Sequence, residues 1–124
     1  LDSQDSSGLR VYDVPSDGAN AASIIFNMNF VNSQKAAIYS NRDFRIGVSH
    51  AINRQQIMVL VYGDMGIPRQ VAPLPTSPLY NEQLETQYTE FNIGLANDYL
   101  DRVLPEKDSE GYRLMPDGNR LVVN

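Results

Sequence analysis

Residues 43–52 carry the clearest helical pattern of apolar positions in the chain. Four apolar residues recur there at i, i+4, i+7 and i+8, a spacing that places them on one face of a helix. They are Phe44, Val48, Ala51 and Ile52. Asn41 or Asp43 is suited to cap the start of this helix, because both residue types accept hydrogen bonds from the first free backbone N–H groups.

A second, strongly apolar helix is predicted to follow directly. Asn53 interrupts the first pattern, and Gln56 stands three positions later. This is the spacing of a capping box, in which each side chain satisfies a backbone N–H at a helix start. The residues from Ile57 to Val61 are all apolar, and Gly63 follows as a common helix end. We therefore predict two short helices that meet near Asn53.

A third helix is predicted to begin at Asn92 and to end before Pro105. Its apolar residues recur at i, i+3, i+6, i+7, i+10 and i+11. They are Ile93, Ala96, Tyr99, Leu100, Val103 and Leu104. The acidic residues 81–91 before it are expected to face solvent, with room for a loose helical turn.

Short strands are predicted towards both ends of the chain. Residues 9–14 and 22–31 alternate between apolar and polar and could pair as an antiparallel hairpin. The second of these strands would direct Ile24, Phe26, Met28 and Phe30 to one face. Residues 111–115 and 120–123 flank a Pro-Asp-Gly-Asn turn and predict a second hairpin.

The remaining segments are expected to be irregular. Residues 1–8 are polar without periodicity and predict a flexible tail, so residues 9–124 would form the single domain. Residues 32–42 are expected to be a polar connection. Residues 67–80 contain four prolines and predict an extended loop packed against the domain. An alternative for residues 75–78, which match a PxxP pattern, is a recognition motif.

The stretch from residue 43 to residue 57 resembles a motif of the bacterial extracellular solute-binding proteins of family 5, the peptide and nickel type that serve ABC importers. The family pattern is Asp-x-Arg-Val-Arg-x-Ala-hydrophobic-x-x-Ala-Ile-Asp-Arg, followed by an isoleucine helix. The matching residues are Asp43, Arg45, Ser49, Ala51, Ile52, Arg54 and Ile57. Gly47 stands where alanine is usual and costs a helix roughly 0.5–1 kcal/mol unless the backbone packs closely there. Asn53 stands where aspartate is usual, a mild change because both cap helices well.

Further blocks resemble the family in the same order over roughly residues 9–123. Residues 26–29 resemble the end of a family strand, and residues 72–78, with Tyr80 shortly after, resemble its proline-containing loop. Asn92, Ala96, Tyr99 and Leu100 stand where the family has a helix of the type Asp-Pro-x-x-Ala-x-x-Leu-Leu. Residues 110–118 resemble an Asp-Gly-Phe-Arg-Leu segment next to Pro-Asp-Gly.

The resemblance implies an α/β fold, part of one lobe of a periplasmic-binding-protein-like (type II) fold with short antiparallel strands and about three helices. Family members are several times longer than this chain, so it also implies a fragment of the second lobe. The implied function is non-enzymatic: capture of peptides or a related small solute (oligosaccharide, opine or metal complex) for ABC permease subunits. The implied location is the periplasm, or the outer side of the membrane with a tether.

A different class of function stays open from the residues alone. The predicted hairpins and the proline-rich loop are also compatible with a small non-enzymatic protein-interaction domain. Net charge −5, without any cluster of Lys or Arg, argues against a nucleic-acid surface. No apolar run approaches the roughly 20 residues that span a bilayer. Contact with the membrane is therefore expected only through the permease.

Candidate catalytic and metal chemistry is sparse. The chain has no cysteine, and His50 is its only histidine. Ser49 and His50 are adjacent and so point about 100° apart on a helix, which prevents a local dyad. We expect His50 to lie at the surface or boundary of its helix. Asp98 and Asp101 could share a helix face but lack further ligands, so no metal site, cofactor or enzymatic activity is predicted.

Most direct ligand contacts are expected to lie outside these 124 residues, because the resemblance covers the first part of the second lobe. Within the chain, the candidates for ligand contact are the polar face of the second predicted strand and the proline-rich loop. The residues are Asn27, Asn29, Arg69, Gln70 and Tyr80. For Asn27 and Asn29 the alternative is hydrogen bonding at the end of a strand.

Overall fold

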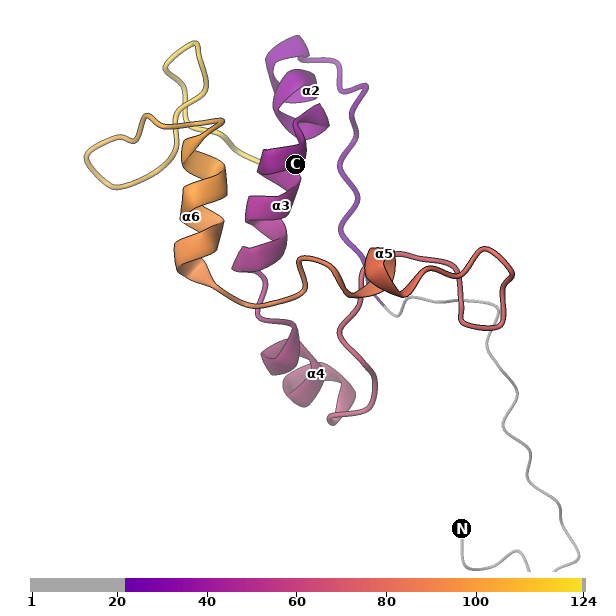
Figure 1. The fold of residues 1–124 in the computed structure, drawn as a ribbon. Coiled ribbons are helices and arrows are strands. Elements are labelled where there is room, and N and C mark those ends of the chain that lie inside the picture. The colour runs from indigo at the N-terminus through magenta and orange to yellow at the C-terminus, as the bar shows by residue number, and fades with distance from the viewer. Residues whose placement is uncertain (1–21, 124) are drawn as a thin grey trace, which may run out of the picture.

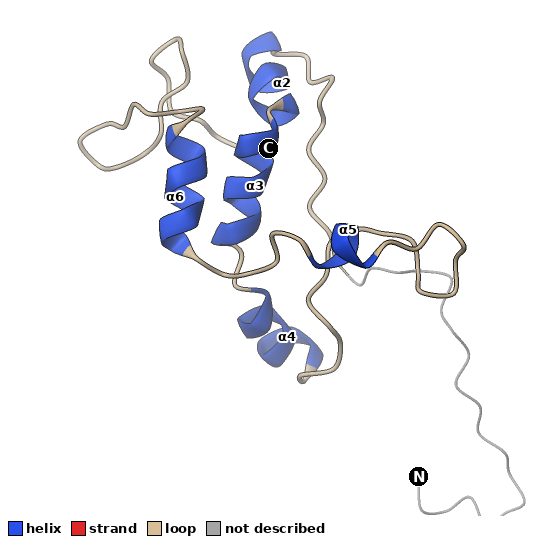
Figure 2. Ribbon diagram, in the orientation of Figure 1, coloured by secondary structure: helices blue, strands red, loops and turns tan. Residues whose placement is uncertain are grey.

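The computed structural model describes residues 22–123. The tail predicted at 1–8 and the strand predicted at 9–14 therefore lie outside the described residues. Five helices follow one another in the described part of the chain (Figures 1 and 2). They are α2 (Ser33–Ser40), α3 (Arg42–Ala51), α4 (Arg54–Tyr62), α5 (Glu82–Thr86) and α6 (Ile93–Asp101). The three predicted helices are present as α3, α4 and α6. The helix α2 forms where an irregular polar connection was predicted, and α5 forms where a loose helical turn was allowed.

An asparagine begins each of these five helices. The side-chain oxygen of every one accepts a hydrogen bond from a backbone N–H in the first turn. The five are Asn32, Asn41, Asn53, Asn81 and Asn92. Only one of the two hydrogen bonds of the predicted capping box is formed at Asn53: the Asn53 side-chain oxygen accepts the Gln56 N–H at 3.0 Å. The Gln56 side-chain oxygen, which a capping box would place at the Asn53 backbone N–H, instead lies 3.4 Å from the Asn53 side-chain Nδ2. Gly63 ends α4 in the left-handed conformation, as predicted.

Among the described helices, α3 packs along α6 and, less extensively, against α2, which precedes it in the chain (Figure 1). Gly47 is the point of closest approach between α3 and α6. A Cβ at this position would lie 2.7 Å from Leu100 Cγ and 3.0 Å from the Ala96 carbonyl oxygen. The glycine at the position where the family usually has alanine is therefore explained by close backbone packing.

The core is largely aromatic. Tyr39 and Phe44 are fully buried, and their ring centroids lie 5.9 Å apart. Phe26 lies 5.3 Å from each of these rings, and Phe30 lies 5.9 Å from Tyr39. Aromatic pairs at such distances add to the stabilisation from burial. Leu104 and Met115 complete the buried cluster, so the end of α6 and the C-terminal segment are anchored to α2 and α3.

Residues 22–31 form no strand, contrary to the expectation. The segment runs extended up to Asn27, where the Asn27 side chain accepts the Asn29 N–H at 3.0 Å and the chain turns. Asparagine favours such local turns because its side chain competes with ladder hydrogen bonds. Phe26 and Phe30 reach the core, but Ile24 remains 63% exposed, so only part of the predicted apolar face is buried.

The predicted C-terminal hairpin is reduced to one isolated antiparallel bridge, Leu114 with Arg120, and a second bridge joins Arg113 to Lys107, which lies outside the predicted strands. The Pro-Asp-Gly turn is present: the Gly118 N–H donates to the Met115 carbonyl at 2.9 Å. Two tight turns follow each other within this segment, at residues 108–111 and 115–118, and leave too few residues between them for a ladder. The described residues therefore contain antiparallel pairing but no strand.

The middle of the described chain, from α4 through the proline-rich loop, is more open than expected. None of the residues of α4 is buried, and Leu60 is 74% exposed. In the proline-rich loop, Val71 and Leu79 are exposed, so the predicted packing of these two side chains is wrong. The loop makes consecutive turns between Leu74 and Tyr80.

No helix among the described residues is long and apolar enough to cross a membrane.

Candidate functional site

Three of the five candidate ligand residues meet at Glu85, a carboxylate on the short helix α5. Arg69 Nη1 forms a short ion pair with Glu85 Oε1, and the Tyr80 hydroxyl donates to Glu85 Oε2 at 2.8 Å. The backbone N–H of Gln70 donates to the Glu85 carbonyl at 2.8 Å. Glu85 is only 6% exposed, so this cluster fixes the proline-rich loop to α5. We call Arg69, Gln70, Tyr80 and Glu85 the Glu85 cluster.

The electrostatics of the cluster follow from the carboxylate. The hydrogen bond to Glu85 raises the pKa of the Tyr80 hydroxyl, and the negative charges of Glu85 and Glu82 act in the same direction. Tyr80 therefore stays a neutral donor throughout the physiological range. The Arg69 charge is already matched by Glu85, so a solute would meet the remaining N–H groups of Arg69 rather than an unpaired positive charge.

Ser49 links the cluster to α3. Its hydroxyl donates to the Tyr88 carbonyl at 2.7 Å and accepts from Arg54 Nη2 at 2.7 Å and from Gln70 Nε2 at 2.9 Å. One donor and two acceptor positions are thereby used, so the hydrogen-bonding capacity of this hydroxyl is filled by partners within the chain. Gln70 Nε2 also donates to the Gln87 carbonyl at 2.9 Å. The Gln70 side-chain oxygen is then the part of this amide that can accept a hydrogen bond from a solute.

His50 is buried, not at a surface or boundary as expected. Its Nδ1 lies 2.9 Å from the Glu90 carbonyl oxygen, so Nδ1 carries the proton, since a carbonyl can only accept. The ring stacks on Tyr99 with a centroid distance of 6.0 Å, and it is 5% exposed. The segment 88–92 folds over this end of α3 and covers the histidine. The contacts support a structural role for His50.

Asn27 and Asn29 do not join the cluster. Both are exposed, and their recorded interaction is the local turn between them. The bond lies in a turn and not at the end of a strand, because residues 22–31 form no strand. Glu85, the organising residue of the cluster, was not among the candidates, because an acidic stretch is usually solvated. The available signal was Asn81, whose capping potential indicates a helix that turns Glu85 inwards.

A large groove opens beside the cluster, with a volume of about 1030 Å³. Its walls come from residues 22–28, α3, α4 and residues 65–71, and most of the lining is apolar. Four arginines line it: Arg42, Arg45, Arg54 and Arg69. No Asp or Glu is found among its described lining residues. Burial without a carboxylate partner lowers the pKa of Arg54, although an arginine stays charged.

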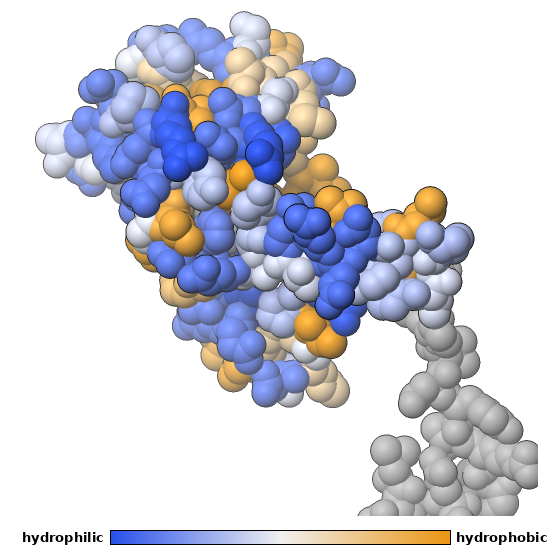
Figure 3. Space-filling model, in the orientation of Figure 1, coloured by the Kyte–Doolittle hydropathy of each residue, from blue (hydrophilic) through white to orange (hydrophobic). Residues whose placement is uncertain are grey.

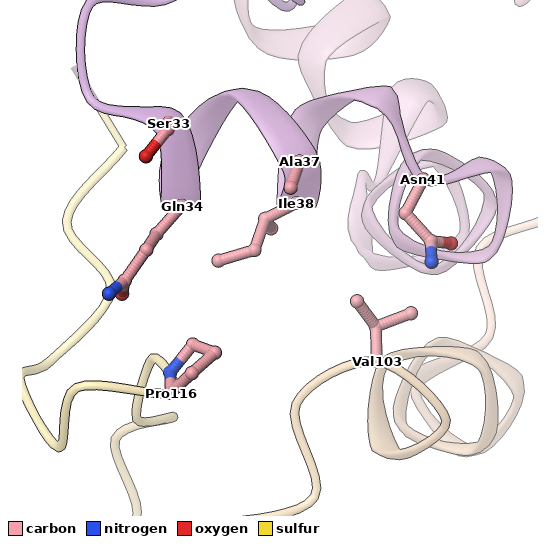
Figure 4. Close-up of a pocket in the computed structure, with 7 residues that line it drawn as sticks. All are labelled: Ser33, Gln34, Ala37, Ile38, Asn41, Val103 and Pro116. Atoms are coloured by element: carbon pink, nitrogen blue, oxygen red, sulfur yellow. The ribbon is translucent and has the colours of Figure 1, made fainter.

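A smaller hollow of about 380 Å³ lies between α2, the end of α6 and the C-terminal turn. Figure 4 shows the Gln34 side chain extending towards Pro116, with Ile38 and Val103 across the opening. None of the candidate ligand residues lines it. In the part of the chain that the structure describes, no three His, Asp or Glu side chains are grouped as a metal ion requires.

Comparison with known proteins identifies a family and similar solved structures. The sequence pattern of the bacterial extracellular solute-binding proteins, family 5 Middle, matches residues 2–123. A solved structure of the oligopeptide-binding protein OppA is similar, with 31% sequence identity and a TM-score of 0.66. The similarity covers 72% of this chain and 14% of the OppA chain, and supports a periplasmic-binding-protein-like fold. No curated protein sequence matches the chain significantly. The chain belongs to the bacterial extracellular solute-binding proteins of family 5.

Proposed function

We propose that this chain is part of the substrate-binding component of an ABC-type importer that captures peptides. The observation that carries the proposal is the family match over residues 2–123, together with the similarity to an oligopeptide-binding protein. The chain spans only a small part of that protein, so the remaining lobe contacts, the permease subunits and the periplasmic or extracellular location belong to the proposal. A binding role also agrees with a Ser49 and a His50 whose hydrogen bonds are structural.

Within this chain, we propose that solute contacts come from the Glu85 cluster. Arg69 and Tyr80 are held by a buried carboxylate, which lowers the entropic cost of orienting them for a ligand. The Gln70 amide is fixed by two donated hydrogen bonds, which leaves its oxygen to accept from a peptide N–H. We also propose Asn27 and Asn29 as solute contacts, since both side chains are exposed and only the Asn27 side-chain oxygen is engaged locally, by the Asn29 backbone N–H.

A thermal melt of the 124-residue chain with solute pools tests the proposal. A ligand that binds only the folded chain raises the midpoint by an amount set by RT ln(1 + [L]/Kd). A pool of short peptides should raise the midpoint, a pool of oligosaccharides should not, and Arg69→Ala should reduce the shift. Arg102→Ala, an exposed arginine on another face, serves as the control. A shift with oligosaccharides alone would change the solute class, and a cooperative melt insensitive to every pool would refute solute contact by this chain.

A further inference from the structure

From Ile57 to its end, the helix α4 is apolar on every side. Residues 57–62 are six consecutive apolar or aromatic residues, and an α-helix turns fully in 3.6 residues, so no polar face remains along this stretch. Yet none of these residues is buried among the described residues, and no other described helix packs against α4. A helix that is apolar all round belongs to the interior of a larger protein. In Figure 3, hydrophobic side chains are visible at the lower end of the molecule, where Figure 1 places α4.

The arginines that line the groove beside α4 also determine which charge its occupant must carry. Arg42, Arg45 and Arg54 line it and make no ion pair with a described carboxylate, in a chain whose net charge is −5. Arg42 bonds the Tyr88 hydroxyl, while Arg45 and Arg54 bond backbone carbonyls. Three positive charges that form no ion pair with a described carboxylate are complementary to carboxylates on whatever fills the groove.

The length of the OppA chain indicates where the segment that fills the groove comes from. The matched region is 14% of the OppA chain, so in that protein much further polypeptide surrounds it. We propose that α4 and the groove seat another polypeptide segment of the same solute-binding protein. This segment brings apolar side chains against Ile57 and Met58 and carboxylates to Arg42, Arg45 and Arg54. The proposal rests on family membership and does not require that peptides bind at the Glu85 cluster.

Two other occupants fit the groove less well. A second copy joined through the same surface by two-fold symmetry would bring arginines against arginines, which is unfavourable. A short transported peptide could fill the groove but would leave the outer side of α4 exposed, including Leu60 and Val61. A polypeptide segment that continues beyond the groove can cover both.

The test uses blocked peptides and the 124-residue chain. The probe is an N-acetylated, C-amidated 14-residue peptide whose only charged and large apolar residues are glutamate and leucine, followed by fluorescence anisotropy. One comparison peptide replaces glutamate by lysine, and another replaces leucine by serine. We expect the acidic apolar peptide to bind at least about tenfold more tightly than either, with affinity that falls as salt is added.

Paired variants locate the binding. Arg42→Glu should weaken it about fivefold or more, whereas Arg102→Glu should not, although both arginines stack on a tyrosine ring. Ile57→Ser should weaken it, whereas Ile93→Ser, at a similarly exposed isoleucine outside the groove, should not. Circular dichroism checks the fold, and Arg42→Gln replaces Arg42→Glu where folding fails.

Four results would overturn the proposal. The first is equal binding of the acidic and the basic peptide. The second is that no peptide binds, although the chain melts cooperatively. Binding that needs free peptide termini would identify a transported ligand. A dimer in sedimentation that Ile57→Ser dissociates would identify a second copy. Solute pools that fail to shift the melt while the blocked peptide binds would refute solute contact by this chain and leave this interface standing.

Discussion

Gly47 on α3 and Leu100 on α6 are in such close contact that a Cβ on Gly47 would lie 2.7 Å from Leu100 Cγ. The Ala96 carbonyl oxygen, at 3.0 Å from the same point, is backbone and cannot move aside easily. The close approach of these two helices, which form the most extensive helix pair of the described chain, therefore depends on a missing side chain.

Gly47→Ala should destabilise the chain although alanine is the better helix former. The propensity gain is about 1 kcal/mol, while overpacking costs roughly 1–3 kcal/mol. Urea denaturation measures the net loss. The same substitution in a Leu100→Ala background should cost less, because the clashing atom is gone. An equal or larger loss in that background would show that the contact does not limit the approach.

Glu85→Ala should lower the free energy of unfolding by about 2 kcal/mol, because it leaves the Arg69 and Tyr80 donors without their buried acceptor. Glu82→Ala, an exposed glutamate on the same helix, is the matched control and should change stability by less than about 0.5 kcal/mol. Chemical denaturation compares the two. Similar small losses in both variants would mean that Glu85 does not organise the loop.

The sequence predicts those parts of the fold whose signals are local. Asn41, Asn53 and Asn92 mark helix starts because a cap acts within three residues, and all three were found. Asn32 and Asn81 carry the same signal, but the helices behind them lack a clear apolar stripe, so they were missed.

The apolar pattern identifies Phe44 as buried, but the predicted face of α3 is wrong in part: Ala51 is exposed, and α3 buries Ile46, Gly47, Ser49 and His50, which lie outside that face. The helix α6 packs against Gly47, and residues 88–92 cover Ser49 and His50. These contacts are distant in sequence, and a local pattern does not contain them.

The Glu85 cluster was predictable only in part for the same reason. The proline-rich loop and Tyr80 stood out by composition, but their common partner is a carboxylate in an acidic segment that composition assigns to solvent. The strand predicted at 22–31 failed at Asn27, where a local side-chain bond turns the chain. A period of two thus indicates an extended chain, and a strand needs a neighbour as well.

Asn53→Asp should leave stability nearly unchanged, whereas Asn53→Ala should cost about 1 kcal/mol. The Asn53 side-chain oxygen accepts the Gln56 N–H at 3.0 Å, and a carboxylate can do the same at the positive end of α4. Thermal melts at pH 7 compare the two variants. A loss of equal size in both would show that the amide group, not the cap oxygen, is what matters.

Acid should loosen the C-terminal segment first. The hydrogen bond from Arg113 lowers the pKa of Asp101, and the Asn119 backbone N–H lowers that of Asp117. Because these folded-state pKa values lie below the unfolded value of 3.8, the unfolded chain binds protons more readily as pH falls. The stabilisation is complete well above pH 3.8 and is lost below it as pH passes through the lowered values. The protection of amides 107–120 against hydrogen exchange, measured relative to the intrinsic exchange rate at each pH, should therefore fall on acidification, and Asp117→Asn should weaken that dependence.

The most direct measurement of solute binding is an NMR titration of the ¹⁵N-labelled 124-residue chain with a mixture of short peptides. Contact at the Glu85 cluster predicts chemical-shift changes centred on the amides of Arg69, Gln70, Tyr80 and Glu85, reduced in Arg69→Ala. Shifts confined to residues 107–120, or an unchanged spectrum of the folded chain at millimolar peptide, would contradict it.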